Sequence, residues 1–152
     1  MSIVGEAKLT KPMSWNREKN NLEQYRALMA LDSAKDIEAG TGGGQMVAKK
    51  VATQIRENGF LGALAFASEK KKDKDGVLKF KNPGHQSVFE AIRKYLVGIS
   101  AIKGAVDSTD MMMESVAKCS AAELRYIMSE SIDYMNYLRR FAKPDKKDGK
   151  DS

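Results

Sequence analysis

The feature that most constrains the fold is the segment of residues 60–68, FLGALAFAS, in which almost every side chain is apolar. Gly59 precedes this segment, and the charged run EKKKDKDG follows it. The segment is far shorter than the roughly 20 residues that a helix needs to cross a bilayer. A helix without a polar face has to be buried on nearly all sides. The segment therefore predicts a central core helix, and the lysine-rich run predicts a solvated helix end and loop.

The rest of the chain also has the apolar periodicity of helices. Its three prolines, Pro12, Pro83 and Pro144, lie at the edges of the periodic segments, where helices tolerate them. The predicted helices cover residues 14–39, 45–58, 60–68, 83–103, 109–118 and the segment from Ser120 up to Pro144. No strand is predicted, because the one alternating stretch, VLKFK at residues 77–81, is short.

Several helix ends carry specific signals. Asn82 is a suitable N-cap for Pro83 at the first helical position. Ser120 and Glu123 form an S-x-x-E capping box. Gly104 is expected to end the helix that Pro83 begins. These signals predict an all-α fold, a compact single-domain bundle of about six helices. The bundle spans residues 14–143, residues 1–13 form a flexible N-terminal segment, and residues 144–152 form a disordered charged tail.

The composition indicates a basic, soluble protein of a reducing compartment. The formal net charge is +6, which favours contact with polyanions such as nucleic acids. Cys119 is the one cysteine, so no internal disulfide is possible and a cytoplasmic location is expected. The N-terminus has no signal-peptide pattern, and no membrane partner is predicted.

Motifs for catalysis, metal binding or cofactor binding are weak. Cys119 and the single histidine, His85, are far apart in the sequence, and His85 lies in a turn-like context, so a catalytic pair is not expected. Zinc arrangements need more His and Cys than the chain has. The GTGGGQ stretch follows a predicted helix and lacks the Lys-Ser/Thr of a phosphate-binding loop, so it is interpreted as a helix connection. We predict no enzyme activity, no metal and no cofactor.

Basic residues remain as the candidate functional feature. Six of them form three neighbouring pairs on different predicted helices, Lys49-Lys50, Arg93-Lys94 and Arg139-Arg140, and such pairs can hold a phosphate backbone without reading sequence. The alternative is that they are ordinary solvated side chains. Tyr95, Tyr134 and Tyr137 could stack on bases. The candidate RNA-binding residues are Arg17, Lys19, Arg26, Lys49, Lys50, Arg56, Arg93, Lys94, Arg139 and Arg140.

Three segments in order give a family resemblance: LEQYRA at 22–27, NGFLGALAFASEK at 58–70 and YMNYLRRFA at 134–142. Together they resemble the small all-helical subunit of the type III-B CRISPR effector, the Cmr complex. The resemblance implies a non-catalytic subunit whose copies stack into a short filament beside backbone subunits, with backbone and large subunits as partners. It also implies that the chain helps hold guide RNA and target RNA in antiviral defence. Arg26, Arg139 and Arg140 are the basic residues inside the matching segments.

Three other readings stay open from the residues alone. The chain could be a stand-alone basic helical nucleic-acid-binding protein, which would bind RNA by itself with a steep salt dependence. It could be a helical adaptor that binds only acidic proteins, and that binding would survive nuclease. An enzyme is the reading with the weakest support.

Overall fold

The structure, a computed structural model, describes residues 14–37 and 44–144. Within them the elements are α2 (Leu22–Ala34), α3 (Gln45–Ser68), β1 (Lys70–Lys72), β2 (Leu78–Phe80), α4 (Pro83–Gly98), α5 (Thr109–Ala117) and α6 (Ala121–Phe141). The mainly helical fold is confirmed, but the described residues form five helices rather than six and add a small sheet. The predicted segment 1–13 and residues 145–152 of the predicted tail 144–152 lie outside the described residues. The predicted extension of the first helix to residue 39 is wrong, because α2 ends at Ala34 and residues 35–37 are not helical; residues 38–39 lie outside the described residues.

The helix number differs because α3 joins two predicted helices across a kink. Gly59 has φ 84° and ψ 162°, which are not helical, while the residues on both sides continue as helix. Only glycine adopts such angles readily. The predicted stop at Asn58-Gly59 is therefore a change of direction within one element.

The segment after the kink is less enclosed than predicted. Phe60, Ala63, Leu64 and Ala67 are buried in the core, but Phe66 is exposed on the other side. The prediction of a helix buried on nearly all sides is wrong for that face. None of the described helices is long and apolar enough to cross a membrane.

The helix starts are partly as predicted. The Ser120–Glu123 capping box is confirmed, and Pro83 lies at the start of α4. Asn82 is the N-cap residue of α4, but its side chain makes no capping hydrogen bond; its side-chain amide instead donates to the Phe66 carbonyl at the end of α3, at 3.0 Å. The start of the first helix at residue 14 is wrong, because Asn21 forms a reciprocal capping box with the residue three positions on and the preceding residues form turns.

Helix α4 ends at Gly98, earlier than the predicted residue 103. Ser100 has a positive φ of 60°. Its amide donates to the Val97 carbonyl, and the Ala101 amide donates to the Leu96 carbonyl. This pair of bonds is a Schellman motif, which satisfies the last carbonyls of the helix. A serine in the position that glycine usually takes gives no sequence signal.

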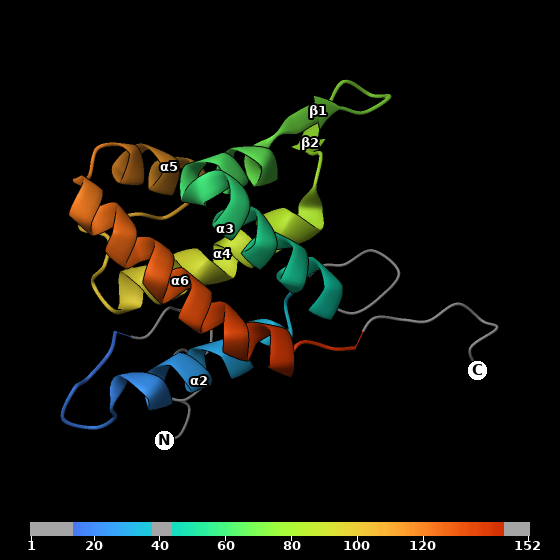
Figure 1. The fold of residues 1–152 in the computed structure, drawn as a ribbon. Helices are drawn as coiled ribbons and strands as arrows, with labels where there is room; N and C mark the ends of the chain where they lie inside the picture. The colour runs from blue at the N-terminus through green and yellow to red at the C-terminus, as the bar shows by residue number, and fades with distance from the viewer. Residues whose placement is uncertain (1–13, 38–43, 145–152) are drawn as a thin grey trace, which may run out of the picture.

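The lysine-rich run is a β-hairpin, so the prediction of a loop without strands is wrong. β1 and β2 pair antiparallel, with Lys70 opposite Phe80 and Lys72 opposite Leu78. The hairpin projects from the bundle between α3 and α4 (Figure 1).

The helices pack around α6 and α4. α6 lies against α2 on one side and α3 on the other, α4 packs on α3 and α6, and α5 packs on α3 and α4 (Figure 1). Phe60 meets Phe89 edge-on, with ring centroids 5.5 Å apart. The Tyr95 ring stacks on Tyr134 at 4.6 Å and on Tyr25 at 6.2 Å. These rings join α2, α3, α4 and α6 in one core.

Candidate nucleic-acid interface

The first turn of α3 lies beside the last turn of α6, and Gly44 permits this approach. Gly44 is buried, and a Cβ there would lie 2.6 Å from Ile37 Cγ2 and 3.3 Å from Ala142 Cβ. The Gln45 amide donates to the Lys143 carbonyl at 3.2 Å. The GTGGG stretch is predicted to be only a helix connection. Its last glycine, Gly44, also has a packing role, because a side chain there would prevent the close approach.

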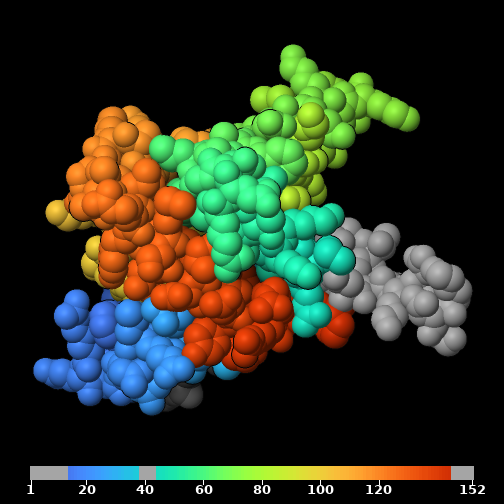
Figure 2. All heavy atoms as spheres, viewed as in Figure 1, coloured from blue at the N-terminus to red at the C-terminus, as the bar shows by residue number. Residues whose placement is uncertain are grey.

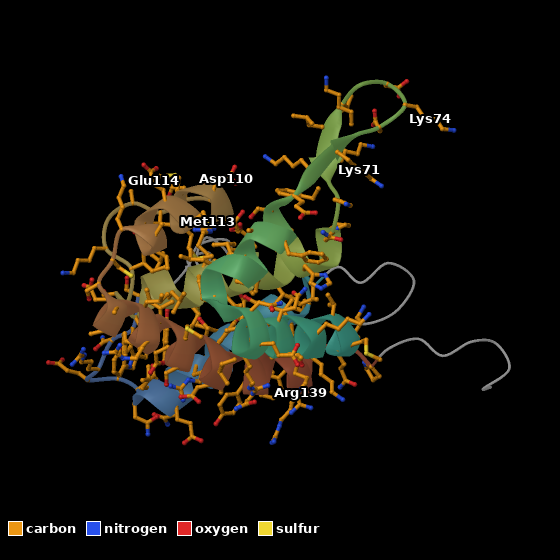
Figure 3. The ribbon with its side chains drawn as sticks, turned by 45° about the horizontal axis from the view of Figure 1, so that its top comes forward. Lys71, Lys74, Asp110, Met113, Glu114 and Arg139 are labelled. Atoms are coloured by element: carbon orange, nitrogen blue, oxygen red, sulfur yellow. The ribbon has the colours of Figure 1, made fainter. Side chains whose placement is uncertain are left out.

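This approach brings three candidate basic residues together. A shallow groove of about 390 Å³ is lined by Gln45, Met46, Lys49, Arg139 and Arg140. We call it the basic groove. Arg139 points outward from α6 in Figure 3. The first turn of α3 and the last turn of α6 meet in this groove, so the positive end of one helix dipole lies beside the negative end of the other and the basic side chains supply the charge. The basic groove is thus a cationic surface without a carboxylate in its lining.

A second groove of about 360 Å³ lies on the other side of Arg140 and has mixed charge. Its lining includes Asp133, Asn136 and Tyr137. The Tyr137 hydroxyl donates to Glu23 Oε2 at 2.6 Å, and this bond raises the pKa of Tyr137. The Asp133 carboxylate in its lining makes this groove less suitable for phosphate than the basic groove.

Arg26 also touches the second groove, but its guanidinium is held by internal contacts. Its Nη2 lies 3.0 Å from Glu130 Oε1, and its Nε donates to the Tyr95 hydroxyl at 3.1 Å. Burial opposes the charge, yet the hydrogen bonds to Tyr95 and Glu130 raise the pKa of Arg26 overall. Arg26 therefore stabilises the α2–α4–α6 junction and is not counted in the basic groove.

Arg93 has a similar structural role. It is only 8% exposed, pairs with Glu90, and donates from Nη1 to the Val106 carbonyl at 2.7 Å. It ties α4 to the segment before α5 and is not part of the basic groove. Lys94, the next residue, is half-buried on α4.

The other candidate residues are dispersed. The Arg17 guanidinium lies over the Trp15 ring at 4.7 Å, and Lys19 is exposed in the same turn region before α2. Lys50 and Arg56 are exposed on α3, and Lys50 lies close enough to His85 to contribute, after burial, to a lowered pKa of that imidazole. None of these four lines the basic groove.

The predicted stacking of bases on tyrosines is wrong for two of the three rings. Tyr95 and Tyr134 are fully buried and stack on each other. Tyr137 remains half-buried beside the second groove.

The hairpin lysines are not among the predicted RNA-binding residues, because in sequence the run of lysines indicates a solvated loop. Only the strand pairing shows that the run projects as an ordered hairpin. Within the described part of the chain, no three His, Cys, Asp or Glu side chains gather closely enough to hold a metal ion.

The fold and the basic groove together define a small, basic helical bundle with a cationic surface. The family model described as CRISPR-associated protein (Cas_Cmr5) matches residues 22–144. The chain therefore belongs to this family and is a small Cmr-type CRISPR-associated subunit. No curated protein and no solved structure matches the chain. The resemblance found in the sequence is confirmed by the family match.

Proposed function

We propose that the chain is a non-catalytic small subunit of a type III-B CRISPR (Cmr) RNA-guided effector complex. In this role it packs along the backbone subunits in the cytoplasm and helps hold the duplex of guide RNA and target RNA in antiviral defence. Family membership supports a Cmr partner. The observation that carries the RNA contact is the basic groove, which brings Lys49, Arg139 and Arg140 to one surface.

The basic groove suits a phosphate backbone rather than a specific base sequence. Phosphate contacts position a nucleic acid without reading it, and effector proteins recognise a guide duplex by its shape and backbone. Partial burial raises the pKa of the Cys119 thiol, which disfavours the nucleophilic thiolate at this one residue.

The test removes two exposed charges from the basic groove in the assembled complex. The variant is Lys49→Ala with Arg140→Ala, and the measurement is the affinity for target RNA at several salt concentrations. Each lost phosphate contact lowers the magnitude of the slope of log K against log salt by about 0.7–0.9, so a decrease of roughly 1.4–1.8 is expected.

The matched control removes two exposed charges elsewhere, by Lys103→Ala with Arg125→Ala. Arg125 and Arg139 are separated by about 21 Å along α6, at 1.5 Å per residue. The control should leave the slope unchanged. An equal slope for the groove variant and the unchanged complex would refute the RNA contact. Tight RNA binding by the purified chain without the other subunits would instead favour a stand-alone nucleic-acid-binding protein.

A further inference from the structure

The β1–β2 hairpin carries most of the formal net charge of the chain. Residues 70–81, KKKDKDGVLKFK, contain six lysines and two aspartates, so their formal charge is +4 of the total of +6. The hairpin stands out from the surface of the bundle at its upper right (Figure 2). None of its residues lines the basic groove, so the proposed RNA contact leaves this charge without a role.

The register of the hairpin places lysines on both faces of the ribbon. Successive strand residues point to opposite faces, and residues paired across the two strands share a face. Lys70 and Lys72 therefore share one face with their partners Phe80 and Leu78. The Lys70 ammonium lies 5.2 Å from the centre of the Phe80 ring, as expected for two side chains on the same face.

The opposite face carries Lys71 and its partner Lys79. Asp73 follows Lys71 by two residues and lies on the same face, where its carboxylate pairs with the Lys79 ammonium at 3.2 Å. Lys74 lies in the turn at the tip of the hairpin. Cationic side chains thus surround the ribbon and do not form a single flat patch.

Three of the six lysines are available to an external partner. Lys71, Lys72 and Lys74 are exposed, and the ion pairs of the hairpin within the described part of the chain do not include them. Lys71 and Lys72 are successive residues, so one unpaired ammonium lies on each face. An acidic protein surface covers one face of a ribbon, whereas the groove of a nucleic-acid duplex has a phosphate backbone on each side.

The hairpin is ordered by its own turn. Asp73 Oδ1 accepts from the Asp75 and Val77 amides at 2.8 and 3.0 Å, and Gly76 supplies the positive φ of 78°. These bonds also lower the pKa of Asp73, so its carboxylate stays charged inside the turn. A preorganised hairpin loses little conformational freedom when it binds.

The dimensions of a two-stranded ribbon match the major groove of B-form DNA. A sheet with its side chains is about 10 Å thick, and this groove is about 12 Å wide. The three residue pairs of β1 and β2 span roughly 10 Å along the strands, which exceeds the groove depth of about 8.5 Å. The major groove of A-form RNA is too narrow for such an element, and its minor groove is shallow. Duplex DNA therefore fits the hairpin better than duplex RNA does.

The apolar side chains of the hairpin favour the same ligand. Leu78 is 59% exposed and Val77 is 53% exposed, and these are the two most exposed large hydrophobic side chains of the described residues. A phosphate backbone alone would leave them uncovered. The floor of the major groove presents the C5-methyl group of thymine, which apolar side chains contact and which uracil lacks.

We propose that the hairpin is a binding element for double-stranded DNA and enters the major groove with Lys71 and Lys72 against the two phosphate backbones. Lys74 at the tip adds a further cation, and Leu78 contacts base edges. The proposal goes beyond the RNA contact, because Lys71 and Lys74 lie far from Arg139 of the basic groove in Figure 3. Its failure would leave the RNA contact standing.

The experiment measures the affinity of the purified full chain for a short, fluorescently labelled DNA duplex at several salt concentrations. Lys71→Ala with Lys72→Ala removes one charge from each face. This variant should lower the magnitude of the slope of log K against log salt by about 1.8, at about 0.9 for each lost phosphate contact. An unchanged slope would overturn the proposal and leave an acidic protein surface as the partner of the hairpin.

Two matched controls also remove two exposed charges each. Lys103→Ala with Arg125→Ala changes neither cationic surface, and Lys49→Ala with Arg140→Ala changes only the basic groove. Both controls should leave the slope for DNA unchanged. A loss for the groove variant equal to that of the hairpin variant would show that DNA uses the basic groove and would contradict the proposal.

Single variants test whether both faces of the ribbon meet phosphate. Lys71→Ala and Lys72→Ala should each lower the magnitude of the slope by about 0.9, with unchanged helical circular dichroism. A loss confined to one of the two variants would identify a one-sided contact and contradict entry into a groove.

The choice of DNA is tested with an RNA duplex of the same sequence. The unchanged chain should bind the DNA duplex more tightly, and the variant Lys71→Ala with Lys72→Ala should lose most of this difference. Equal affinity for the two duplexes would contradict the preference for the B-form groove.

The contact with base edges is tested by Leu78→Ser with Val77→Ser, which keeps every charge. This variant should bind the DNA duplex more weakly at every salt concentration, with the slope against log salt unchanged. An affinity equal to that of the unchanged chain would show that the hairpin stays outside the groove and would contradict the proposal.

Discussion

Glu130 receives two donors at one oxygen atom inside the bundle. Its Oε1 accepts from Arg26 Nη2 at 3.0 Å and from the Tyr95 hydroxyl at 2.7 Å. The Tyr95 ring stacks on Tyr134, so the polar contacts and the aromatic core are continuous. Removing one member of such a group leaves the other charges or donors unsatisfied.

Substitution of Glu130 therefore has a large predicted effect. Glu130→Ala leaves the Arg26 guanidinium nearly buried without its main partner, and the free energy of unfolding should fall by about 3 kcal/mol. Asp133→Ala is the matched control, because Asp133 lies 3.9 Å from the same guanidinium but is half exposed. The control should cost less than about 1 kcal/mol in urea unfolding. Equal losses for the two variants would contradict the larger contribution expected from the buried contact between Arg26 and Glu130.

The buried tyrosines predict a loss of stability in alkali. Burial raises the pKa of Tyr25 to about 12, and burial also raises the pKa of Tyr95 and of Tyr134 well above the usual value. Because the pKa is raised in the folded state, the unfolded chain loses these protons at a lower pH than the folded chain does. The contribution of the tyrosines to the free energy of unfolding is therefore fully present below about pH 10 and declines above it.

The expected size of this effect follows from the three rings. Between about pH 9 and pH 11 each ring contributes about 1.4 kcal/mol, so the free energy of unfolding should decrease by roughly 4 kcal/mol. Urea unfolding at the two pH values measures it. Tyrosinate absorbance from the buried rings near pH 10, with the helical circular dichroism unchanged, would contradict this assignment.

At the scale of elements, the kink of α3 depends on Gly59. Its φ of 84° and ψ of 162° belong to a region that other residues avoid, although a Cβ there would meet no atom within 4 Å. Gly59→Ala should therefore destabilise the fold by about 1–3 kcal/mol through backbone strain alone.

Gly62, one turn further on, provides the matched control. It is exposed in regular helix, and a Cβ there would make an ordinary contact of 3.5 Å with Asn58 Cβ. Gly62→Ala should raise the free energy of unfolding by up to about 1 kcal/mol. Thermal unfolding of both variants would show opposite shifts, and a shift in the same direction would refute the strained kink.

The sequence predicted those elements whose signals are local. Apolar periodicity and the S-x-x-E box at Ser120 predicted α6 correctly. The end of α4 was missed because Ser100 adopts a positive φ through Schellman bonds that only the folded backbone reveals. The hairpin was missed because lysines have little strand propensity, and its turn depends on the Asp73 side chain.

The candidate site was less predictable than the fold. Arg93 and Lys49 look alike in sequence, yet one is buried against Val106 and the other lines the basic groove. The difference arises from packing between segments far apart in the chain, which a pattern of basic pairs cannot reveal. Gly44 is a second example. A glycine is required there because Ile37 and Ala142 pack against it, and the sequence does not show that these residues are neighbours.

For the whole molecule, the two cationic surfaces lie on different sides. Arg139 of the basic groove and Lys74 of the hairpin occupy distant positions in Figure 3. The bundle therefore presents two separate cationic surfaces, and the proposed RNA contact uses only the basic groove.

The measurement that tests the central claim most directly is a tagged pull-down of the chain from its native host, divided into nuclease-treated and untreated halves. Proteins and RNA are identified in both halves. The account predicts large CRISPR effector subunits together with short guide RNAs in both. Heterogeneous nucleic acid without fixed protein partners, lost on nuclease treatment, would contradict it.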